Sequence, residues 1–290
     1  MGAALLASVW LASTVLSSTA WAGPCEADTT GIASGPVTVG FQDGDLGVPR
    51  RVCGRTEVAL APGGLAVVDT ANFYGHIVAG GSLEGSWAPS RRTEVFASIE
   101  AFRYDSVITP ITATYMGFGH IAVGASQRLW DNDTFAVGLH GRVVAPTAVG
   151  LYRNAYPIGL DVGVSGLWAP LPTLRVHADV AGLGSAAISH GPALPRAGAR
   201  VMLGGEWQPV KPFALVLDVT SGFGYTAPVD HVAGSLGLRF AVGERVGIEL
   251  GASVPFAGRE RALAAGELKV NVRLGKLEGH VAAPKPVPPG

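Results

Sequence analysis

The sequence predicts an all-β fold, namely a single antiparallel, up-and-down transmembrane β-barrel of about twelve strands. Three observations support this prediction. The chain of 290 residues is 48% hydrophobic and only 15% charged, yet after residue 22 it contains no uninterrupted apolar run long enough for a membrane-spanning helix. Its apolar residues instead alternate with a period of two, as on a strand with two unlike faces. Four of its six tryptophans recur at similar intervals after the first 22 residues, each close to the end of such a strand.

The overall composition excludes several classes of protein. Lys and Arg number 21 and Asp and Glu number 22, so the net charge is −1, whereas a nucleic-acid-binding surface requires an excess of basic residues. The low content of charged residues argues against intrinsic disorder. The 41 glycines do not recur at every third position, which argues against a collagen-like chain. We therefore expect a folded protein with no nucleic-acid partner.

Residues 1–22 have the features of a secretory signal peptide. They contain no charged side chain, they are apolar, and they end in Ala20-Trp21-Ala22, the small-x-small pattern that precedes signal-peptidase cleavage. We expect this segment to be removed after export rather than to form a short buried helix. The mature chain would then begin at Gly23 in an oxidising compartment.

Residues 23–55 hold both cysteines of the chain, Cys25 and Cys53. In an exported protein, two cysteines this close in sequence predict a disulfide bond rather than two free thiols. The segment offers too few other ligands for a zinc site, and the rest of the chain shows no cluster with metal-ligand spacing. The sequence leaves open whether residues 23–55 fold back into the barrel as a plug or remain outside it.

From residue 56 onward the chain is a series of amphipathic strands. Residues 213–220 and 268–274 are clear examples, because every second residue is apolar and the residues between are charged, polar or small. Weak segments at 56–75 and 112–130 leave strand numbers of ten or fourteen open. The twelve expected strands begin near residues 57, 76, 93, 112, 134, 158, 173, 198, 212, 230, 245 and 264.

The aromatic residues mark both ends of the predicted strands. Short turns follow four tryptophans and one phenylalanine: Trp87, Trp130, Trp168, Trp207 and Phe240. The tyrosines lie at the opposite strand ends or in the connections there: Tyr74, Tyr104, Tyr115, Tyr152, Tyr156 and Tyr225. Two belts of aromatic rings separated by apolar strand faces are what the two interfaces of a bilayer require. The alternative is a soluble barrel with aromatic residues at its rims.

The connections between the strands are of two kinds. Those on the tryptophan side are short, whereas on the tyrosine side we expect long loops, notably 145–157 and 183–197. An even number of strands returns both ends of the barrel to the tryptophan side. One local conflict is visible, because Gln127 falls on the apolar face of its strand and Trp130 on the other face. A β-bulge near Gly124 to Ser126 would repair both positions.

Together, the leader, the alternating strands, the aromatic belts and the unequal connections resemble the outer-membrane β-barrel proteins of Gram-negative bacteria, porins among them. The likeness covers residues 56–277 and is architectural, without a motif of one specific family. It implies an outer-membrane location, contact with lipid and insertion by the barrel-assembly machinery. The Pro-rich tail, residues 278–290, departs from the pattern and is expected to be extended in the periplasm. Residues 23–55 would also lie in the periplasm unless they form a plug.

The inward faces of the predicted strands carry charges of both signs. The lumen-lining charges are Glu84, Glu100, Arg142, Asp161, Arg175, Asp179, Arg200, Asp218, Arg239, Glu249, Glu267, Lys269 and Arg273. The same face carries Arg128, His120, His140, His177 and His231. Because unpaired buried charges are costly, we expect an interior that is either hydrated or crossed by ion pairs. Near-equal numbers of the two signs predict weak ion selectivity.

These features favour a passive channel for small polar solutes. A non-conducting structural barrel of the envelope is the alternative if ion pairs fill a narrow lumen. A surface adhesin or receptor is a further alternative, because loop 145–157 contains Tyr152, Arg153, Asn154 and Tyr156. The sequence leaves open a homo-oligomer, since a seam between barrels is as apolar as a lipid-facing surface.

Catalysis is not expected. Ser165, His177 and Asp179 share the inward face of neighbouring strands, so a Ser-His-Asp arrangement is geometrically conceivable. The nearest match to a nucleophile elbow, residues 233–237, lies in the middle of a strand rather than at a strand-to-helix turn. We therefore predict that the protein is not an enzyme and binds no cofactor or metal.

Overall fold

The computed structural model of the chain describes most of the predicted barrel and short parts of the segment before it. The described residues are 25, 35–37, 51–69, 74–90, 92–108, 113–145, 147, 156–188, 194–224, 227–258 and 264–274. The predicted signal peptide, residues 1–22, and the predicted tail, residues 278–290, lie outside them. In the part of the chain that is described, no helix is long and apolar enough to span a membrane.

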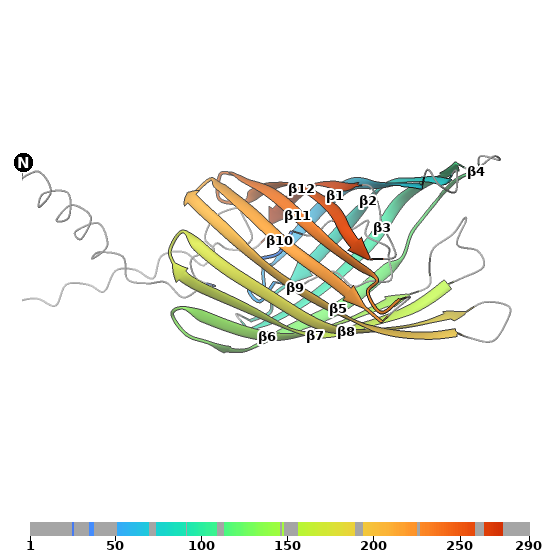
Figure 1. The fold of residues 1–290 in the computed structure, drawn as a ribbon. Helices are drawn as coiled ribbons and strands as arrows, with labels where there is room; N and C mark the ends of the chain where they lie inside the picture. Colours follow the sequence, from blue (N-terminus) through green and yellow to red (C-terminus); the bar gives the residue numbers. More distant parts are fainter. Residues whose placement is uncertain are drawn as a thin grey trace, which may run out of the picture.

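Thirteen β elements in the described residues form one antiparallel sheet (Figure 1). Their bounds are β1 Glu57–Asp69, β2 Tyr74–Trp87, β3 Thr93–Ile108, β4 Ala113–Gly117, β5 Ile121–Asp131, β6 Phe135–Ala145, β7 Tyr156–Leu171, β8 Leu174–Ile188, β9 Leu194–Val210, β10 Phe213–Phe223, β11 His231–Val242, β12 Val246–Gly258 and β13 Ala264–Arg273. Each element pairs with its sequence neighbours apart from the β4–β5 step, which is the up-and-down order predicted from the sequence.

Elements β4 and β5 are two parts of one strand. Both pair with β3, with β4 opposite its last residues and β5 opposite its first. Between them the backbone of Gly119 and His120 still hydrogen-bonds to Glu100 of β3. The thirteen elements therefore form twelve strands, and the predicted number is confirmed.

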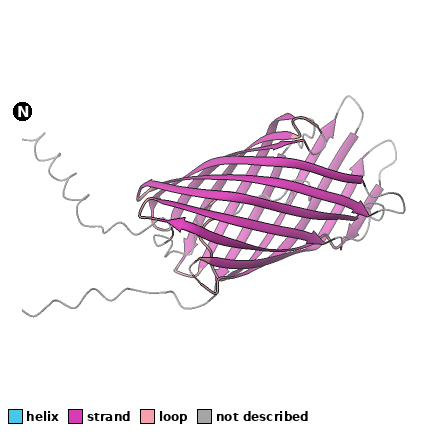
Figure 2. Cartoon of the chain, turned by 90° about the horizontal axis from the view of Figure 1, so that it is seen from below, coloured by secondary structure: helices cyan, strands magenta, loops and turns pink. Residues whose placement is uncertain are grey.

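The sheet closes on itself because β1 pairs with both β2 and β13 (Figure 2). Glu57, the first residue of β1, lies opposite Arg273 on one side and Ser86 on the other. Closure leaves no unpaired strand edge, which is the condition for a β-sheet in lipid. The chain enters and leaves the barrel at the same end, as an even strand number requires.

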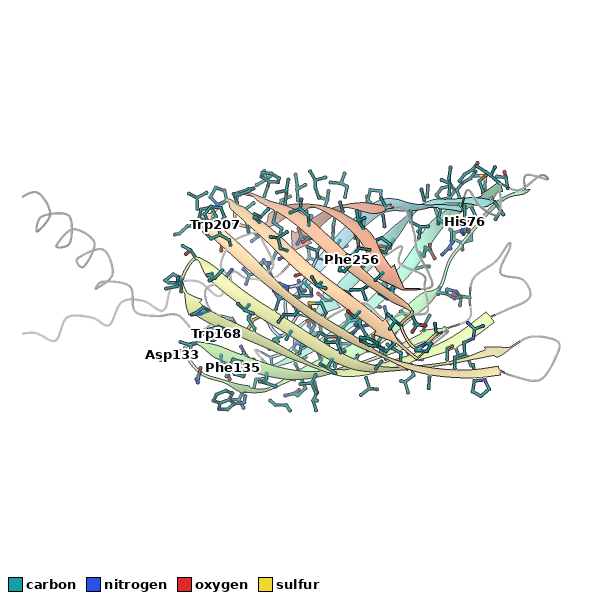
Figure 3. The ribbon with its side chains drawn as sticks, viewed as in Figure 1. His76, Asp133, Phe135, Trp168, Trp207 and Phe256 are labelled. Carbon is teal, nitrogen blue, oxygen red and sulfur yellow. A yellow bond between two sulfur atoms is a disulfide. The ribbon has the colours of Figure 1, made fainter. Side chains whose placement is uncertain are left out.

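Alternation along each strand separates an apolar outer face from a polar inner face. On β10, Leu217 and Val219 are exposed, whereas Val216, Asp218 and Thr220 are buried inside the barrel. The same pattern recurs around the sheet, so the exposed large side chains form a continuous hydrophobic surface (Figure 3). An apolar face of this extent matches a lipid environment rather than water.

The short turns gather at one end of the barrel, where Figure 3 labels Trp168 and Trp207. The turn between β7 and β8 contains only 172–173, and the turn between β9 and β10 only 211–212. The connection between β6 and β7, residues 146–155, lies at the opposite end and mostly outside the described residues. The predicted asymmetry of connection length therefore holds at these positions.

Two local predictions are wrong. The β-bulge lies between Arg128 and Trp130, rather than near Gly124 to Ser126. The extra residue turns Trp130 outward, while Gln127 stays on the outer face and accepts a hydrogen bond from Thr93 at 2.7 Å. The register between β5 and β6 shifts only between Arg128 and Trp130, and this shift defines the position of the bulge.

The long loop expected at 183–197 is also shorter than predicted. Strand β8 continues to Ile188 and β9 begins at Leu194, with Leu183 already paired with Gly198. Backbone pairing proceeds through the small residues of this stretch because ladder hydrogen bonds do not depend on side-chain type.

The outer face yields a prediction about depth in the bilayer. We expect Leu217→Arg, in the middle of β10, to lower the free energy of unfolding in lipid vesicles by about 2–4 kcal/mol, since a charge there faces hydrocarbon. Val210→Arg, at the end of β9, should cost at most about 1 kcal/mol because arginine can reach the interface. Urea titration followed by tryptophan fluorescence measures both. Equal costs would contradict the placement of Leu217 in the membrane.

Candidate functional site

The interior of the barrel is the candidate functional site, because its wall carries buried ionisable side chains. Arg200 lies in the central part of this wall and is 1% exposed. It donates from Nη2 to Oδ1 of Asp179 at 2.7 Å and from Nη1 to Oδ2 of Asp161 at 3.1 Å. These charge-assisted hydrogen bonds satisfy a cation whose burial would otherwise be costly.

Asp179 is the shared acceptor of this central group. Its Oδ2 atom contacts Nε2 of His140 at 2.7 Å and accepts a hydrogen bond from the hydroxyl of Ser165 at 2.8 Å. All three side chains are buried. The serine therefore donates to a carboxylate and not to a histidine, which is not the Ser-His-Asp order that nucleophilic catalysis requires.

A second histidine–aspartate pair reaches across one strand. His177 on β8 and Asp218 on β10 are both level with Gly204 on β9, and Nε2 of His177 contacts Oδ1 of Asp218. A Cβ atom on Gly204 would lie 1.7 Å from that oxygen. The pair therefore depends on the absence of a side chain between its members. His177 is thus paired with Asp218, whereas Ser165 donates to Asp179.

At the tryptophan end of the wall, two arginines share one carboxylate. Glu206 is 1% exposed. It accepts from Nη1 of Arg175 at 2.6 Å and from Nη1 of Arg239 at 2.9 Å, and Arg239 also pairs through Nε with Glu249. Charges alternate along this row, so each buried ion faces one of opposite sign.

Arg51 precedes the first strand and joins two strands at the mouth of the barrel. It donates to Glu57 on β1 at 2.7 Å and to Glu94 on β3 at 3.1 Å. Burial acts to lower the pKa of Arg51, but the charges and hydrogen bonds of Glu57 and Glu94 outweigh it and hold this pKa above its ordinary value. The cation is therefore present over the whole physiological pH range.

The wall formed by β2, β3 and β13 is more open than the wall formed by β8–β10. Lys269 pairs with Glu84 across β1, with side chains 16% and 30% exposed. Arg103 pairs with Asp105 at 2.7 Å and with Glu100 at 3.4 Å. Asp105 is buried, but Glu84, Glu100, Arg103 and Lys269 retain exposed surface, and we therefore place the accessible part of the interior beside β2 and β3.

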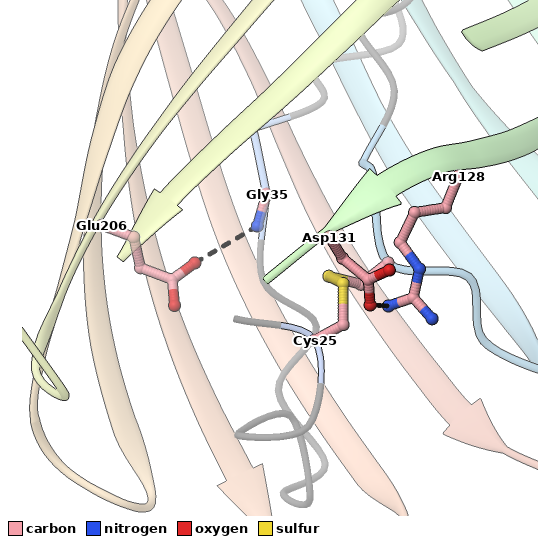
Figure 4. The surroundings of a disulfide bond; sticks show 6 residues. Cys25, Gly35, Arg128, Asp131 and Glu206 are labelled. Carbon is pink, nitrogen blue, oxygen red and sulfur yellow. Dashed lines mark hydrogen bonds and ion pairs between the residues drawn. A yellow bond between two sulfur atoms is a disulfide. The ribbon is translucent and has the colours of Figure 1, made fainter. Parts of the chain in front are cut away.

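The backbone of Gly35–Val37 lies inside the barrel (Figure 4). The amide of its first residue donates to Oε2 of Glu206 at 3.3 Å, and the amide of its last residue donates to Oδ2 of Asp218 at 2.6 Å. Arg239 donates to the carbonyl oxygens of its first two residues at 2.8 and 2.9 Å. This short stretch of the segment 23–55 therefore lies inside the barrel, which is one of the two placements that the sequence left open.

The predicted disulfide between Cys25 and Cys53 is confirmed, with Cα atoms 5.3 Å apart. Cys53 packs with Val52 and with two inward residues of the wall, Ala136 on β6 and Leu167 on β7. The disulfide therefore lies inside the tryptophan end of the barrel.

Among the residues that the structure describes, no group of three or more His, Cys, Asp or Glu side chains is placed to hold a metal ion.

The comparisons with known proteins concern the fold. No family model and no curated protein matches the sequence. Among solved structures, the COG4313 outer membrane channel from Pseudomonas putida F1 aligns with a TM-score of 0.57 at 9% identity, covering 78% of this chain and 97% of that chain. The β domain of the Bordetella autotransporter BrkA aligns at 0.51 with 12% identity, covering 76% and 100%. The KdgM porin aligns at 0.50 with 9% identity, covering 76% and 99%.

The chain has the fold of the outer-membrane β-barrels. At these identities the likeness extends to the architecture and not to a substrate. The roles of individual residues in this barrel must therefore be inferred from its own side chains.

On the outer face, the aromatic residues named from the sequence lie at the short-turn end. All five are exposed and close to a turn: Trp87, Trp130, Trp168, Trp207 and Phe240. Of the tyrosines, Tyr104 lies on the outer face opposite Ala79. Tyr152 and Tyr225 fall outside the described residues, and so do the side chains of Tyr74, Tyr115 and Tyr156.

The inner wall contains the charged residues named from the sequence, and ion pairs join many of them. Those that ion-pair there are Glu84, Glu100, Arg142, Asp161, Arg175, Asp179, Arg200, Asp218, Arg239, Glu249 and Lys269. Glu267 is buried on the same wall, and Arg273 lies opposite the buried Glu57. Arg128 pairs with Asp131 at 3.5 Å near the disulfide (Figure 4).

Sequence reasoning missed several members of the wall, notably Glu57, Glu94, Asp105 and Glu206. Strand parity carried the signal for Glu206, which follows Gly204 by two residues on the same face. It was overlooked because it stands beside a tryptophan that faces lipid. No comparable signal pointed to Gly35–Val37, because its contacts use backbone atoms.

Gly204 provides a test of the wall. We expect Gly204→Val to separate His177 from Asp218 and to lower the free energy of unfolding by about 3 kcal/mol, because the buried carboxylate then loses one of its hydrogen-bond partners. Gly205→Val is the matched control, because that residue faces outward and its Cβ would meet only one backbone oxygen at 3.8 Å. Urea unfolding in vesicles compares the two variants. Equal stability would show that the pair does not depend on the gap.

Proposed function

We propose that this outer-membrane barrel is a passive channel for small polar solutes. The observation that supports the proposal is the inner wall, which carries ionisable side chains of both signs beneath an apolar outer face. A barrel with no role in passage could fill its interior with apolar side chains at less cost. Solved proteins of similar fold include a porin and an outer membrane channel, which agrees with this role.

The pathway would follow the more accessible wall beside β2 and β3. There Glu84 and Glu100 alternate with Arg103 and Lys269, so a passing solute meets donors and acceptors in turn. Because both signs are present at similar density, neither cations nor anions would be strongly preferred. The ionisable groups of the wall are already paired with one another, which suits a passive conduit rather than catalysis.

We infer the location and partners of the protein from its leader and its apolar outer face. Export through residues 1–22, insertion by the barrel-assembly machinery and contact with outer-membrane lipid would place the chain in a Gram-negative outer membrane. The apolar outer face is also compatible with a homo-oligomer.

A second candidate is a non-conducting structural barrel. The observation that favours it is the covered wall of β8–β10, where Arg200, Glu206 and Asp179 are at most 1% exposed. The adhesin or receptor alternative rests on loop 145–157, which lies largely outside the described residues and gains no support here.

Planar-bilayer recording on the mature chain, residues 23–290, tests the channel. We expect discrete current steps and a cation-to-anion permeability ratio close to one, because the accessible wall carries both signs. Heat-dependent migration on a denaturing gel is the control for a folded barrel. A folded barrel that carries no current at any voltage, before or after reduction of its disulfide, would instead support the structural barrel.

A further inference from the structure

The contacts of Gly35–Val37 with the wall are contacts to main-chain atoms. Two amides and two carbonyl oxygens of this short stretch are each bound by a charged side chain: Glu206 and Asp218 accept, and Arg239 donates twice. Hydrogen bonds to charged partners are stronger than neutral ones. The three side chains therefore form a site that binds the main-chain atoms of a short peptide segment.

Two glycines allow this docking. Gly237 on β11 leaves a notch for Val37, since a Cβ atom there would lie 2.5 Å from Cγ2 of Val37. Val37 is buried in this notch against Val216 of β10 and Ala265 of β13. Gly35 adopts a φ of +136°, and a Cβ atom on it would lie 2.8 Å from Cβ of Arg51. Both the docked segment and its receptor are thus shaped for contact.

The docked segment and the disulfide lie on different sides of the lumen. Cys53 packs against β6 and β7, whereas Val37 packs against β10 and β13. In the closed strand order these walls lie on nearly opposite sides. The described parts of this segment, residues 35–37 and 51–53, therefore contact the wall on both sides of the lumen, and the disulfide joins residues 25 and 53 at one of these walls. The diameter of a barrel grows with its number of strands, and about eight strands already enclose enough space for a core of side chains. Twelve strands therefore leave room for a segment of backbone inside.

We propose that Glu206, Asp218 and Arg239 form a peptide main-chain binding site, that Gly35–Val37 is its tethered ligand, and that the occupied site closes the channel. The closure rests on the channel function proposed above. When the segment leaves, Arg239 retains its pairs with Glu206 and Glu249, so the empty wall remains charge-balanced and the site can be refilled. An unattached short peptide that presents the same main-chain atoms, with glycine at its first bound position, is the class of ligand that would compete for it.

Cross-linking tests the docking independently of any measurement of channel conductance. The Cβ atom of Val37 lies 3.6 Å from the position of a Cβ atom on Gly237, within the range of about 3.5–4.5 Å that a disulfide spans. We expect the full chain with Val37→Cys and Gly237→Cys to form this link under mild oxidation. The control pairs Val37→Cys with Gly234→Cys, which faces outward on the same strand. Mass spectrometry of unreduced peptides reads the result, and a link no more abundant than in the control overturns the docking.

Recording in bilayers tests the closure. Gly35→Val should expel the segment while leaving the wall intact. The loss of one hydrogen bond to a charged group shifts the equilibrium between the docked and undocked segment by about tenfold or more. The open fraction of the channel should therefore rise by at least that factor. A synthetic peptide of residues 33–39 should then block the variant, whereas the same peptide with valine in place of its glycine should not. Gly234→Val is the control that should behave as the wild type.

The outcomes separate the two proposals. If the wild type and Gly35→Val conduct equally, the closure is wrong and the channel stands. If neither conducts although both are folded and the 37–237 cross-link forms, the channel function is wrong and the docking stands. A peptide that blocks wild type and variant alike, or neither, contradicts the binding site.

Discussion

The structure depends on one rule, that a backbone polar group in hydrocarbon must find its partner within the chain. A sheet meets this rule only when its first and last strands pair, as β1 and β13 do here. Closure divides the side chains into two populations, because successive residues of a strand point to opposite faces. The outer population is apolar since it meets lipid. The inner population is free to carry charge, provided that each charge finds a partner.

The inner wall finds these partners by reaching over intervening strands. His177 and Asp218 meet because Gly204 leaves the space between them empty. His140 and Asp179 meet in the same way, where a Cβ atom on Gly163 would lie 2.7 Å from the imidazole. Glycine on the inner face therefore sets which charges can pair. This gives a physical reason for inward glycines in a fold whose strands would otherwise be weakened by them.

Period-two alternation and the spacing of the tryptophans predicted the twelve strands and their faces, because both are properties of the chain read in one dimension. The disulfide followed from the export signal and the cysteine count. The bulge at Trp130 was misplaced because its position depends on the register with β6. The partners of Arg200 could not be predicted, since they lie on strands whose relative height only the closed sheet determines. Docking of Gly35–Val37 left no trace in the sequence, because every residue has a backbone.

The pairs that span a strand have a mechanical consequence. Alternation alone permits any strand to slip past its neighbour by two residues, since a slip of two restores apolar and polar residues to their own faces. Such a slip of β9 would carry Gly204 away from His177 and bring Met202 or Glu206 into the gap. The pairs of the inner wall thus select one strand register among several that would expose an equally apolar face to lipid.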